Sequence, residues 1–258
     1  MANFKEITSK DNAIIKQISK LQNSARERRE MGLFVAEGLR LLDDIADNGI
    51  EIETLVLSKK YYEKQGGNLN KYIQNAKETV LVNDSVFSKI ADTKTPQGIL
   101  AVGKIPQNSN KKIKQDGKYI ALENLADPSN LGAIARTAEA LGIDGIIVSG
   151  NGCDPYSPKV IRASMGTVLR MDIFVVDDFV SVLKCSGLKL FGCVVTDGSD
   201  IRKADFSGGA AVIIGNEANG LTPESKNLGQ NVTIPMSGLA ESLNAASAAS
   251  IAMWELKR

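Results

Sequence analysis

The sequence predicts an α/β protein of two domains, on three observations. Short apolar runs typical of buried strands alternate with helical stretches along the chain. A polar segment, residues 105–117, interrupts this alternation and has the composition of a linker. The chain has 258 residues, 43% of them hydrophobic, which is enough for one large or two ordinary domains. We therefore expect an α/β domain over 1–104, a linker over 105–117 and a second α/β domain over 118–258.

The first domain is expected to start with a helix over residues 11–30, where apolar side chains recur close to a 3.6-residue period. These side chains are Ile14, Ile15, Ile18 and Leu21. The elements expected after this helix are Phe34–Gly38 leading into a helix over about 39–47, strands at 55–57 and 79–82, and a turn into a further strand within 95–102.

The second domain repeats the alternation with more strands. Strands are expected at 119–122, 145–148, 173–176, 189–195, 211–214 and 232–234, and helices at about 130–141, 158–163 and 245–252. Apolar runs of this kind, separated by helices, indicate a mostly parallel buried sheet. Ligands of such sheets bind beyond the carboxyl ends of the strands, so we expect the functional site there.

Composition excludes several kinds of chemistry. The chain contains no histidine, which removes the commonest general base, the Ser-His-Asp triad and the usual transition-metal ligand. Its three cysteines, Cys153, Cys185 and Cys193, are widely spaced, so neither a disulfide framework nor a zinc site is expected. The first residues lack the apolar core of a signal peptide, and no apolar run reaches membrane-spanning length. These observations predict a cytoplasmic protein without a metal.

The net charge of +1 argues neither for nor against a nucleic-acid partner. Local excess of positive charge occurs near the N-terminus, where Arg26, Arg28 and Arg29 lie together, and in the run from Lys111 to Lys118. Such stretches can contact phosphates, and they are also typical of a solvated helix face or a linker.

Three segments of the second domain carry candidate chemistry. The first leaves a strand, turns at Asp127-Pro128 and enters a helix at Asn130, a favoured cap residue. Arg136 follows six positions later, under two turns into the helix, so the backbone that carries it is rigid. A capped helix with a surface arginine explains this segment equally well. The second segment is Gly215-Asn216-Glu217-Ala218-Asn219-Gly220, a carboxylate on a glycine-bounded turn after a strand, which is typical of a ligand or catalytic position.

The third segment runs from Ile234-Pro235-Met236 through a glycine turn to Ser242-Leu243-Asn244 at the start of a helix rich in Ala and Ser. Small residues permit close packing, and polar residues at a helix start anchor a ligand or the backbone; an N-cap on an Ala-rich core helix is the simpler alternative. The common nucleotide loops are absent: the nearest match to G-x-G-x-x-G, at 150–155, has Pro155 in place of the third glycine, and no phosphate-loop motif occurs.

Together and in this order, Asn130 with Arg136, Asn216-Glu217 with Gly220, and Ser242-Leu243-Asn244 resemble the three motifs of the SpoU (TrmH-type) RNA ribose 2′-O-methyltransferases of the SPOUT superfamily. The first half, through Phe34–Gly38 and Thr95–Val102, resembles the ribosomal-protein-like substrate-binding domain of that family. The resemblance therefore covers nearly the whole chain.

The resemblance implies a C-terminal trefoil knot that holds S-adenosylmethionine, and a homodimer with the active site near the subunit interface. The residues it implies for the cofactor are Thr196, Gly198, Gly215, Asn216, Ile234, Met236 and Leu243. Those it implies for catalysis are Arg136, Glu217, Asn130, Ser242 and Asn244. Contacts with RNA are expected from Arg26, Arg28, Arg29 and Arg136.

In similar enzymes, the arginine that corresponds to Arg136 is usually assigned as the base. A guanidinium has a pKa of about 12.5–13.8 and is a poor base at neutral pH. Our hypothesis is that Arg136 positions the ribose or its phosphate and lowers the pKa of the hydroxyl, that Glu217 orients Arg136, and that Asn130, Ser242 and Asn244 fix the local geometry or the substrate.

The leading interpretation is a methyltransferase acting on ribosomal RNA. Transfer RNA stays open as the substrate, as does a role in antibiotic resistance. A non-catalytic RNA-binding assembly factor of the same fold is disfavoured by the intact Asn130, Arg136, Glu217 and Asn244. An unrelated α/β enzyme with another nucleotide is disfavoured by the missing phosphate loops.

Overall fold

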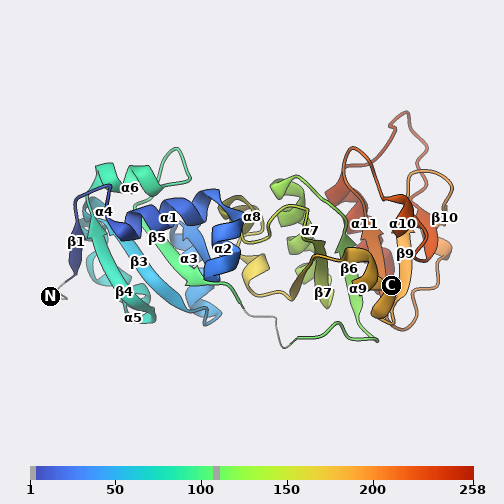
Figure 1. Ribbon diagram of the computed structural model, residues 1–258, viewed down its shortest axis with the longest axis horizontal. Coiled ribbons are helices and arrows are strands. Elements are labelled where there is room, and N and C mark those ends of the chain that lie inside the picture. The colour runs from blue at the N-terminus through green and yellow to red at the C-terminus, as the bar shows by residue number, and fades with distance from the viewer. Residues whose placement is uncertain (1–3, 107–110) are drawn as a thin grey trace. The chain divides into compact units, whose positions relative to one another are not determined.

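The computed structural model describes residues 4–106 and 111–258, so part of the predicted linker, 107–110, lies outside the described residues together with residues 1–3. The chain forms two compact units (Figure 1). The first contains the described residues up to Pro106 together with Tyr156–Arg170, and the second contains the described residues from 111 to Pro155 and those from Met171 onward. No helix of the described part is long and apolar enough to span a membrane.

The first unit is built on a five-stranded sheet of order β1-β4-β3-β5-β2. β1, β4 and β3 run parallel, and β5 is antiparallel to both of its neighbours. The strands are β1 (Lys5–Ile7), β2 (Leu33–Glu37), β3 (Ile52–Ser58), β4 (Ala76–Val82) and β5 (Ile99–Lys104). The helices are α1 (Ala13–Asn23), α2 (Ala25–Met31), α3 (Leu39–Asp47), α4 (Lys59–Gln65), α5 (Asn70–Asn75) and α6 (Asp84–Ile90).

The predicted helix over 11–30 is two helices, because Ser24 breaks it. Ser24 has an extended backbone (φ −131°), which ends α1, and its hydroxyl accepts a hydrogen bond of 3.2 Å from the backbone N–H of Glu27, which starts α2. The apolar positions were placed correctly: Ile15, Ile18 and Leu21 are buried in the core of this unit.

Arg28 corrects the prediction of an RNA contact. Its side chain is buried, and its guanidinium donates hydrogen bonds to the carbonyl oxygens of Leu21 and, at 3.2 Å, of Gln22. The carbonyls of the last helical turn have no partner within their own helix, so Arg28 satisfies the end of α1. This arginine therefore stabilises the fold and does not present its charge to a ligand.

A segment from the second half of the sequence, 156–170, belongs to the first unit. Its helix α8 (Pro158–Ala163) packs against β2, and a short 3₁₀ helix, η2 (Thr167–Leu169), follows. Arg162 pairs with Asp92, and Arg170 pairs with Asp44 at 2.6 Å. From sequence this stretch was expected within residues 118–258, where it joins two strands of one sheet.

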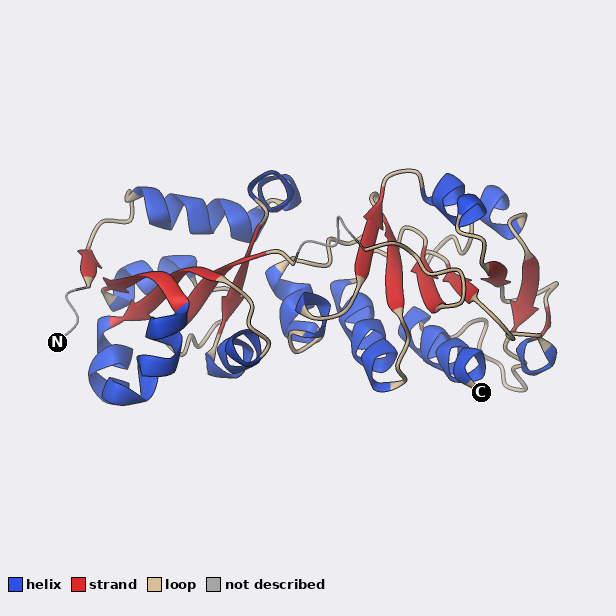
Figure 2. Cartoon of the chain, turned by 90° about the horizontal axis from the view of Figure 1, so that it is seen from below, coloured by secondary structure: helices blue, strands red, loops and turns tan. Residues whose placement is uncertain are grey.

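The second unit is built on a seven-stranded sheet, β10-β12-β9-β11-β6-β7-β8, in which every pairing is parallel. Figure 2 shows helices on both sides of this sheet. The strands are β6 (Lys118–Leu122), β7 (Gly145–Ser149), β8 (Ile173–Val176), β9 (Lys189–Cys193), β10 (Ser199–Asp200), β11 (Ala210–Ile214) and β12 (Gln230–Thr233). The helices are α7 (Pro128–Ala140), α9 (Phe179–Cys185), α10 (Pro223–Lys226) and α11 (Ala245–Lys257), with a 3₁₀ helix, η3 (Ile201–Lys203).

This architecture confirms the predicted mixed α/β fold with a parallel second sheet. The central strands β6, β7 and β11 are buried along their whole length except for one end residue of β6. α7 and α11 pack side by side, and α11 also packs on β11 and β6. The C-terminal helix is thus part of the core, and its alanines Ala249 and Ala252 are completely buried.

Candidate active site

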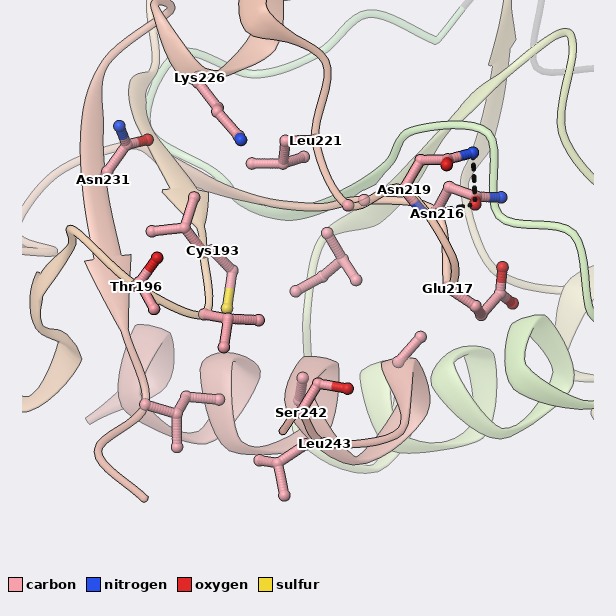
Figure 3. A pocket seen from close by; sticks show the side chains of 18 of the residues that line it. Cys193, Thr196, Asn216, Glu217, Asn219, Leu221, Lys226, Asn231, Ser242 and Leu243 are labelled. Atoms are coloured by element: carbon pink, nitrogen blue, oxygen red, sulfur yellow. Dashed lines mark hydrogen bonds between the residues drawn. The ribbon is translucent and has the colours of Figure 1, made fainter. Parts of the chain in front are cut away.

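A cavity of about 600 Å³ lies at the carboxyl ends of β9 and β11, beside the start of α11 (Figure 3). Most of the residues predicted for the cofactor and for catalysis line it: Thr196, Gly215, Asn216, Glu217, Ile234, Met236, Ser242, Leu243 and Asn244. Three of the predicted residues, Gly198, Asn130 and Arg136, are not part of this lining.

Gly198, which was expected to contact the cofactor, does not line the cavity. A Cβ atom at this position would lie 2.6 Å from the carbonyl carbon of Val232, so Gly198 lets the chain pack tightly against β12. The glycine here serves the approach of two backbones and not the lining of the cavity.

Glu217 is held by the start of α7. Its carboxylate accepts hydrogen bonds from the backbone N–H groups of Ala126 and Asp127, both at 3.1 Å, and from Nδ2 of Asn130 at 2.9 Å. Burial raises the pKa of this carboxyl group, but the hydrogen bonds from Asn130 and from backbone amides outweigh it and hold the pKa below its ordinary value. Glu217 is therefore an ionised acceptor.

Asn130 connects this carboxylate to the third segment. Nδ2 of Asn244 donates to Oδ1 of Asn130 at 2.9 Å, and Oδ1 of Asn244 caps α11 by accepting from the N–H groups of Ala246 (2.9 Å) and Ser247 (3.2 Å). One chain of hydrogen bonds, Glu217–Asn130–Asn244, thus joins all three sequence segments.

The cap of α7 was predicted one turn too late. Asp127 is the cap: its side chain accepts a 2.8 Å hydrogen bond from the N–H of Ser129, with Pro128 at the first helical position. Asn130 lies inside the first turn and is buried. Its side chain is thereby free to bond Glu217 and Asn244 instead of its own helix end.

Arg136 lies on the exposed side of α7 and makes no hydrogen bond or ion pair with any residue that the structure describes. The expected contact between Glu217 and Arg136 is absent. Six residues along a helix correspond to about 9 Å and about 240° of rotation, so the side chains of Asn130 and Arg136 leave α7 about 120° apart. Glu217 acts on the end of the helix that carries Arg136, and not on the guanidinium.

The turn that carries Glu217 is shaped by Asn216. Oδ1 of Asn216 accepts from the N–H groups of Ala218 (3.0 Å) and Asn219 (3.1 Å), and the backbones of Asn216 and Gly220 are doubly hydrogen-bonded. Gly220 has φ +66°, and a Cβ at Gly215 would overlap the backbone of Gly220 and Leu221. The turn therefore requires both glycines.

Two residues at the end of β6, which sequence reasoning missed, hold this turn at both ends. Asn124, with φ +54°, accepts a 2.9 Å hydrogen bond on its carbonyl oxygen from Nδ2 of Asn216. The buried carboxylate of Glu123 accepts from the N–H (2.9 Å) and hydroxyl (2.7 Å) of Thr222 and from the hydroxyl of Ser225 (2.6 Å). The available signal was a carboxylate directly after an apolar strand.

The walls of the cavity suit an organic ligand with an apolar ring. Ile214, Leu221, Ile234 and Leu243 supply apolar surface, while Lys226 and Asn231 lie on the side opposite Glu217 (Figure 3). Burial raises the pKa of the Cys193 thiol to about 11, so this side chain is a neutral wall and not a nucleophile. Within the described residues, no cluster of three or more metal-ligating side chains is found.

The three arginines of α2 that were predicted to contact RNA differ in exposure. Arg26 is exposed and pairs with Glu30 at 2.6 Å, and Arg29 is exposed on the same helix. Both present charge at the surface of the first unit, in contrast to the buried Arg28.

Comparison with known proteins gives matches over both units. The sequence profile of the SpoU rRNA Methylase family matches residues 117–254, and that of an MRM3-like substrate binding domain matches residues 12–101. The chain is 29% identical to the 23S rRNA (guanosine(2553)-2′-O)-methyltransferase RlmP of Bacillus subtilis, over 98% of this chain and 100% of RlmP.

Solved structures agree over the whole length. An AdoMet-bound rRNA methyltransferase from Sinorhizobium meliloti is 33% identical, with a TM-score of 0.82 over 98% of this chain and 97% of that one. The SpoU methyltransferase AviRb from Streptomyces viridochromogenes, in complex with AdoMet, is 26% identical, with a TM-score of 0.83 over 95% and 97% of the two chains.

Proposed function

Because the chain belongs to the SpoU rRNA methylase family, we propose that it transfers a methyl group from S-adenosylmethionine to a ribose 2′-hydroxyl of ribosomal RNA. The observation that carries this proposal is the hydrogen-bonded chain Glu217–Asn130–Asn244, which joins the three family motifs beside a 600 Å³ cavity. Relatives matched over nearly their whole length are named as 23S rRNA 2′-O-methyltransferases.

The cavity fits the cofactor. Ile234, Leu243 and Leu221 would hold its adenine between apolar walls, and the turn from Gly215 would bring backbone groups close to it. When bound there, S-adenosylmethionine supplies an electrophilic methyl group. The chain's own residues have to form the cavity, orient the ribose and favour loss of the proton from its 2′-oxygen.

Arg136 is the residue we assign to the ribose or its phosphate. Its guanidinium has no protein partner in the described structure and is carried by α7, whose first turn is fixed by Glu217 and Asn244. Donors aimed at a developing negative charge stabilise it and so lower the pKa of the hydroxyl. Glu217, Asn130 and Asn244 then position α7, and Ser242 is a further lining residue.

The domain division and the assembly belong to the same proposal. Residues 1–104 would bind RNA, with Arg26 and Arg29 as exposed cations, residues 105–117 would link the two domains, and residues 118–258 would hold the catalytic site.

Trp254 and Ile251 of α11 are 62% and 38% exposed, which supports a homodimer that covers this face. A trefoil knot is supported by the segment 234–244, which contributes Ile234, Met236 and Ser242–Asn244 to the cavity beside the 214–221 turn before α11 packs on β11. We place the protein in the cytoplasm.

Ribosomal RNA is favoured over transfer RNA. A solved structure that concerns 2′-OH methylation of C/U34 on tRNA is 30% identical but covers only 54% of this chain, whereas the rRNA methyltransferase from Sinorhizobium meliloti covers 98%. The match over nearly the whole of this chain, both units included, is thus to an enzyme named for ribosomal RNA.

The test uses S-adenosylmethionine with a labelled methyl group and total RNA from cells that lack the protein, followed by digestion to nucleosides. We expect label in a 2′-O-methyl nucleoside of ribosomal RNA with the wild-type protein and none with Arg136→Ala. Label in transfer RNA instead would show that transfer RNA, and not ribosomal RNA, is the substrate. Absence of cofactor binding by calorimetry would refute the enzyme and favour a non-catalytic RNA-binding factor.

A further inference from the structure

A second cavity, of about 310 Å³, lies entirely within the first unit. It is formed by residues 37–41 at the junction of β2 and α3, by the loop 93–97, and by Arg162 and Met165 of the segment 156–170. The landmarks 34–38 and 95–102, which sequence comparison alone singled out, therefore meet at this cavity. Nothing in the methyl-transfer site uses them.

Most acceptor groups of this cavity are already bonded. Oε1 of Gln97 accepts from the N–H of Leu39 at 2.8 Å, which satisfies the start of α3. Both carboxylate oxygens of Glu37 are used: one accepts from the N–H of Asp92 at 2.7 Å and of Thr93 at 3.2 Å, and the other accepts from the hydroxyl of Thr93. The negative charge of Glu37 thus has three donors of its own.

Several donors, in contrast, have no partner. Arg40 is exposed and makes no hydrogen bond or ion pair within the described residues. The same holds for the hydroxyl of Thr95, and Gln97 uses only its oxygen. Arg162 adds a second cation, paired with Asp92. Unused donors beside a fixed cation favour a ligand with anionic and hydrogen-bond-accepting oxygens.

The remaining wall is apolar and comes from Leu39, Leu41 and Met165. A volume near 310 Å³ is at the lower end of the range of small-molecule sites, about 300–1,000 Å³. It has room for one nucleotide and not for a duplex. A phosphate that faces an arginine, with sugar or base against apolar side chains, matches this division of the lining, and unpaired RNA bases are recognised in such pockets.

We propose that this cavity binds one unpaired nucleotide of the RNA substrate, with its phosphate at Arg40 and its sugar or base against Leu41 and Met165. The choice of RNA as the source rests on the proposed function. A free nucleotide has the same chemistry, but a single unpaired arginine in an open cavity is a weak site for one, whereas a nucleotide of a large RNA is held by contacts elsewhere as well.

The test measures binding of the full-length protein to a 23S rRNA transcript by filter binding between 50 and 200 mM salt, a range in which phosphate contacts dominate the salt dependence. Arg40→Glu removes the proposed phosphate contact, and Thr95→Val removes one donor with little change of shape. Lys60→Glu is the matched control, because Lys60 is an exposed, unpaired cation on α4 outside the cavity lining.

We expect Arg40→Glu to weaken binding about tenfold and to reduce the slope of log K against log salt by about 1. Thr95→Val should weaken binding about threefold, and Lys60→Glu less than twofold. If Arg40→Glu behaves like Lys60→Glu, with the slope unchanged, the inference is wrong.

Two further measurements distinguish a nucleotide of RNA from a free nucleotide, and a failure of this inference from a failure of the proposed function. Calorimetry with AMP and UMP should detect no binding tighter than about 1 mM; micromolar binding lost in Arg40→Glu would assign the cavity to a free nucleotide and overturn the RNA proposal. Methyl transfer is followed in parallel. Binding of RNA that depends on Arg40, without methyl transfer, would refute the proposed function alone, whereas an active enzyme indifferent to Arg40 would refute this inference alone.

Discussion

Nδ2 of Asn244 donates a 2.9 Å hydrogen bond to Oδ1 of Asn130 and so ties the start of α11 to the first turn of α7. The two residues are 114 positions apart in sequence. Because Asn130 also donates to Glu217, its amide is oriented in one way only: nitrogen toward the carboxylate and oxygen toward Asn244. Replacing the amide by any group that cannot both donate and accept breaks the connection.

Asn130→Asp tests this orientation. The new carboxylate would face Glu217 at hydrogen-bond distance, so like charges meet where a donor is required. We expect a loss of unfolding free energy of about 1–3 kcal/mol and a large loss of methyl transfer. Urea unfolding measures the first quantity. Asn75→Asp, at an exposed site on α5, is the control and should change stability by less than about 0.5 kcal/mol.

The ionisation of Glu217 predicts a dependence of stability on pH. Its pKa in the folded protein is held below the ordinary 4.5, so its hydrogen bonds stabilise the fold above pH 4.5 and this contribution is lost as the pH falls through the folded value. The difference in unfolding free energy between wild type and Glu217→Gln should therefore be constant near neutral pH and shrink below pH 4.5. A difference that grows on acidification would contradict the assignment.

Arg136→Lys separates charge from geometry. Lysine keeps the positive charge but loses the planar pair of donors, so we expect methyl transfer to fall about 100-fold while cofactor affinity stays unchanged. Single-turnover kinetics and calorimetry give the two quantities. Activity near wild type with intact cofactor binding would eliminate the bidentate positioning of the substrate.

Gly215→Ala should abolish cofactor binding. The added methyl group overlaps the backbone of Gly220 and Leu221, and backbone cannot move aside as a side chain can. The turn would open and the cavity would lose its shape. Gly67→Ala is the matched control, since a Cβ at Gly67 meets no atom within 4 Å. Equal cofactor affinity of the two variants would show that the turn tolerates a side chain.

Glu123→Gln tests a positioning residue. The buried carboxylate holds Thr222 and Ser225 through three hydrogen bonds, and an amide can accept only part of them. We expect the KM for S-adenosylmethionine to rise about tenfold with a smaller change in kcat, because the turn and not the reacting atoms is disturbed. A lower Tm with an unchanged KM would mean that Glu123 serves stability alone.

The sequence predicted most strands because a buried parallel strand needs a run of apolar residues, as in Ala210–Ile214, and few other elements produce one. Polar residues were harder to place. Arg28 looks the same in sequence as its exposed neighbours, and only the position of the end of α1 decides that it is buried. Glu217 was recognised as a site residue, but its partner depends on which side of α7 faces the turn.

Long-range packing was outside the reach of sequence patterns. The helix Pro158–Ala163 was recognised, yet periodicity carries no information on which sheet an apolar face covers. The same is true of Glu123: a carboxylate directly after an apolar strand marks the position, but its partner Thr222 lies 99 residues later and no sequence pattern links the two.

The packing of 156–170 on β2 has a consequence for how the protein is made. The first unit is not a continuous stretch of chain, so a nascent polypeptide that has emerged as far as Pro106 still lacks α8 and the ion pairs of Asp44 and Asp92. At about 5–20 residues per second, translation needs roughly 3–13 s more to supply them. During that interval the strands β6 and β7 are synthesised while the face of β2 is uncovered, and completion of the N-terminal unit has to await part of its C-terminal neighbour.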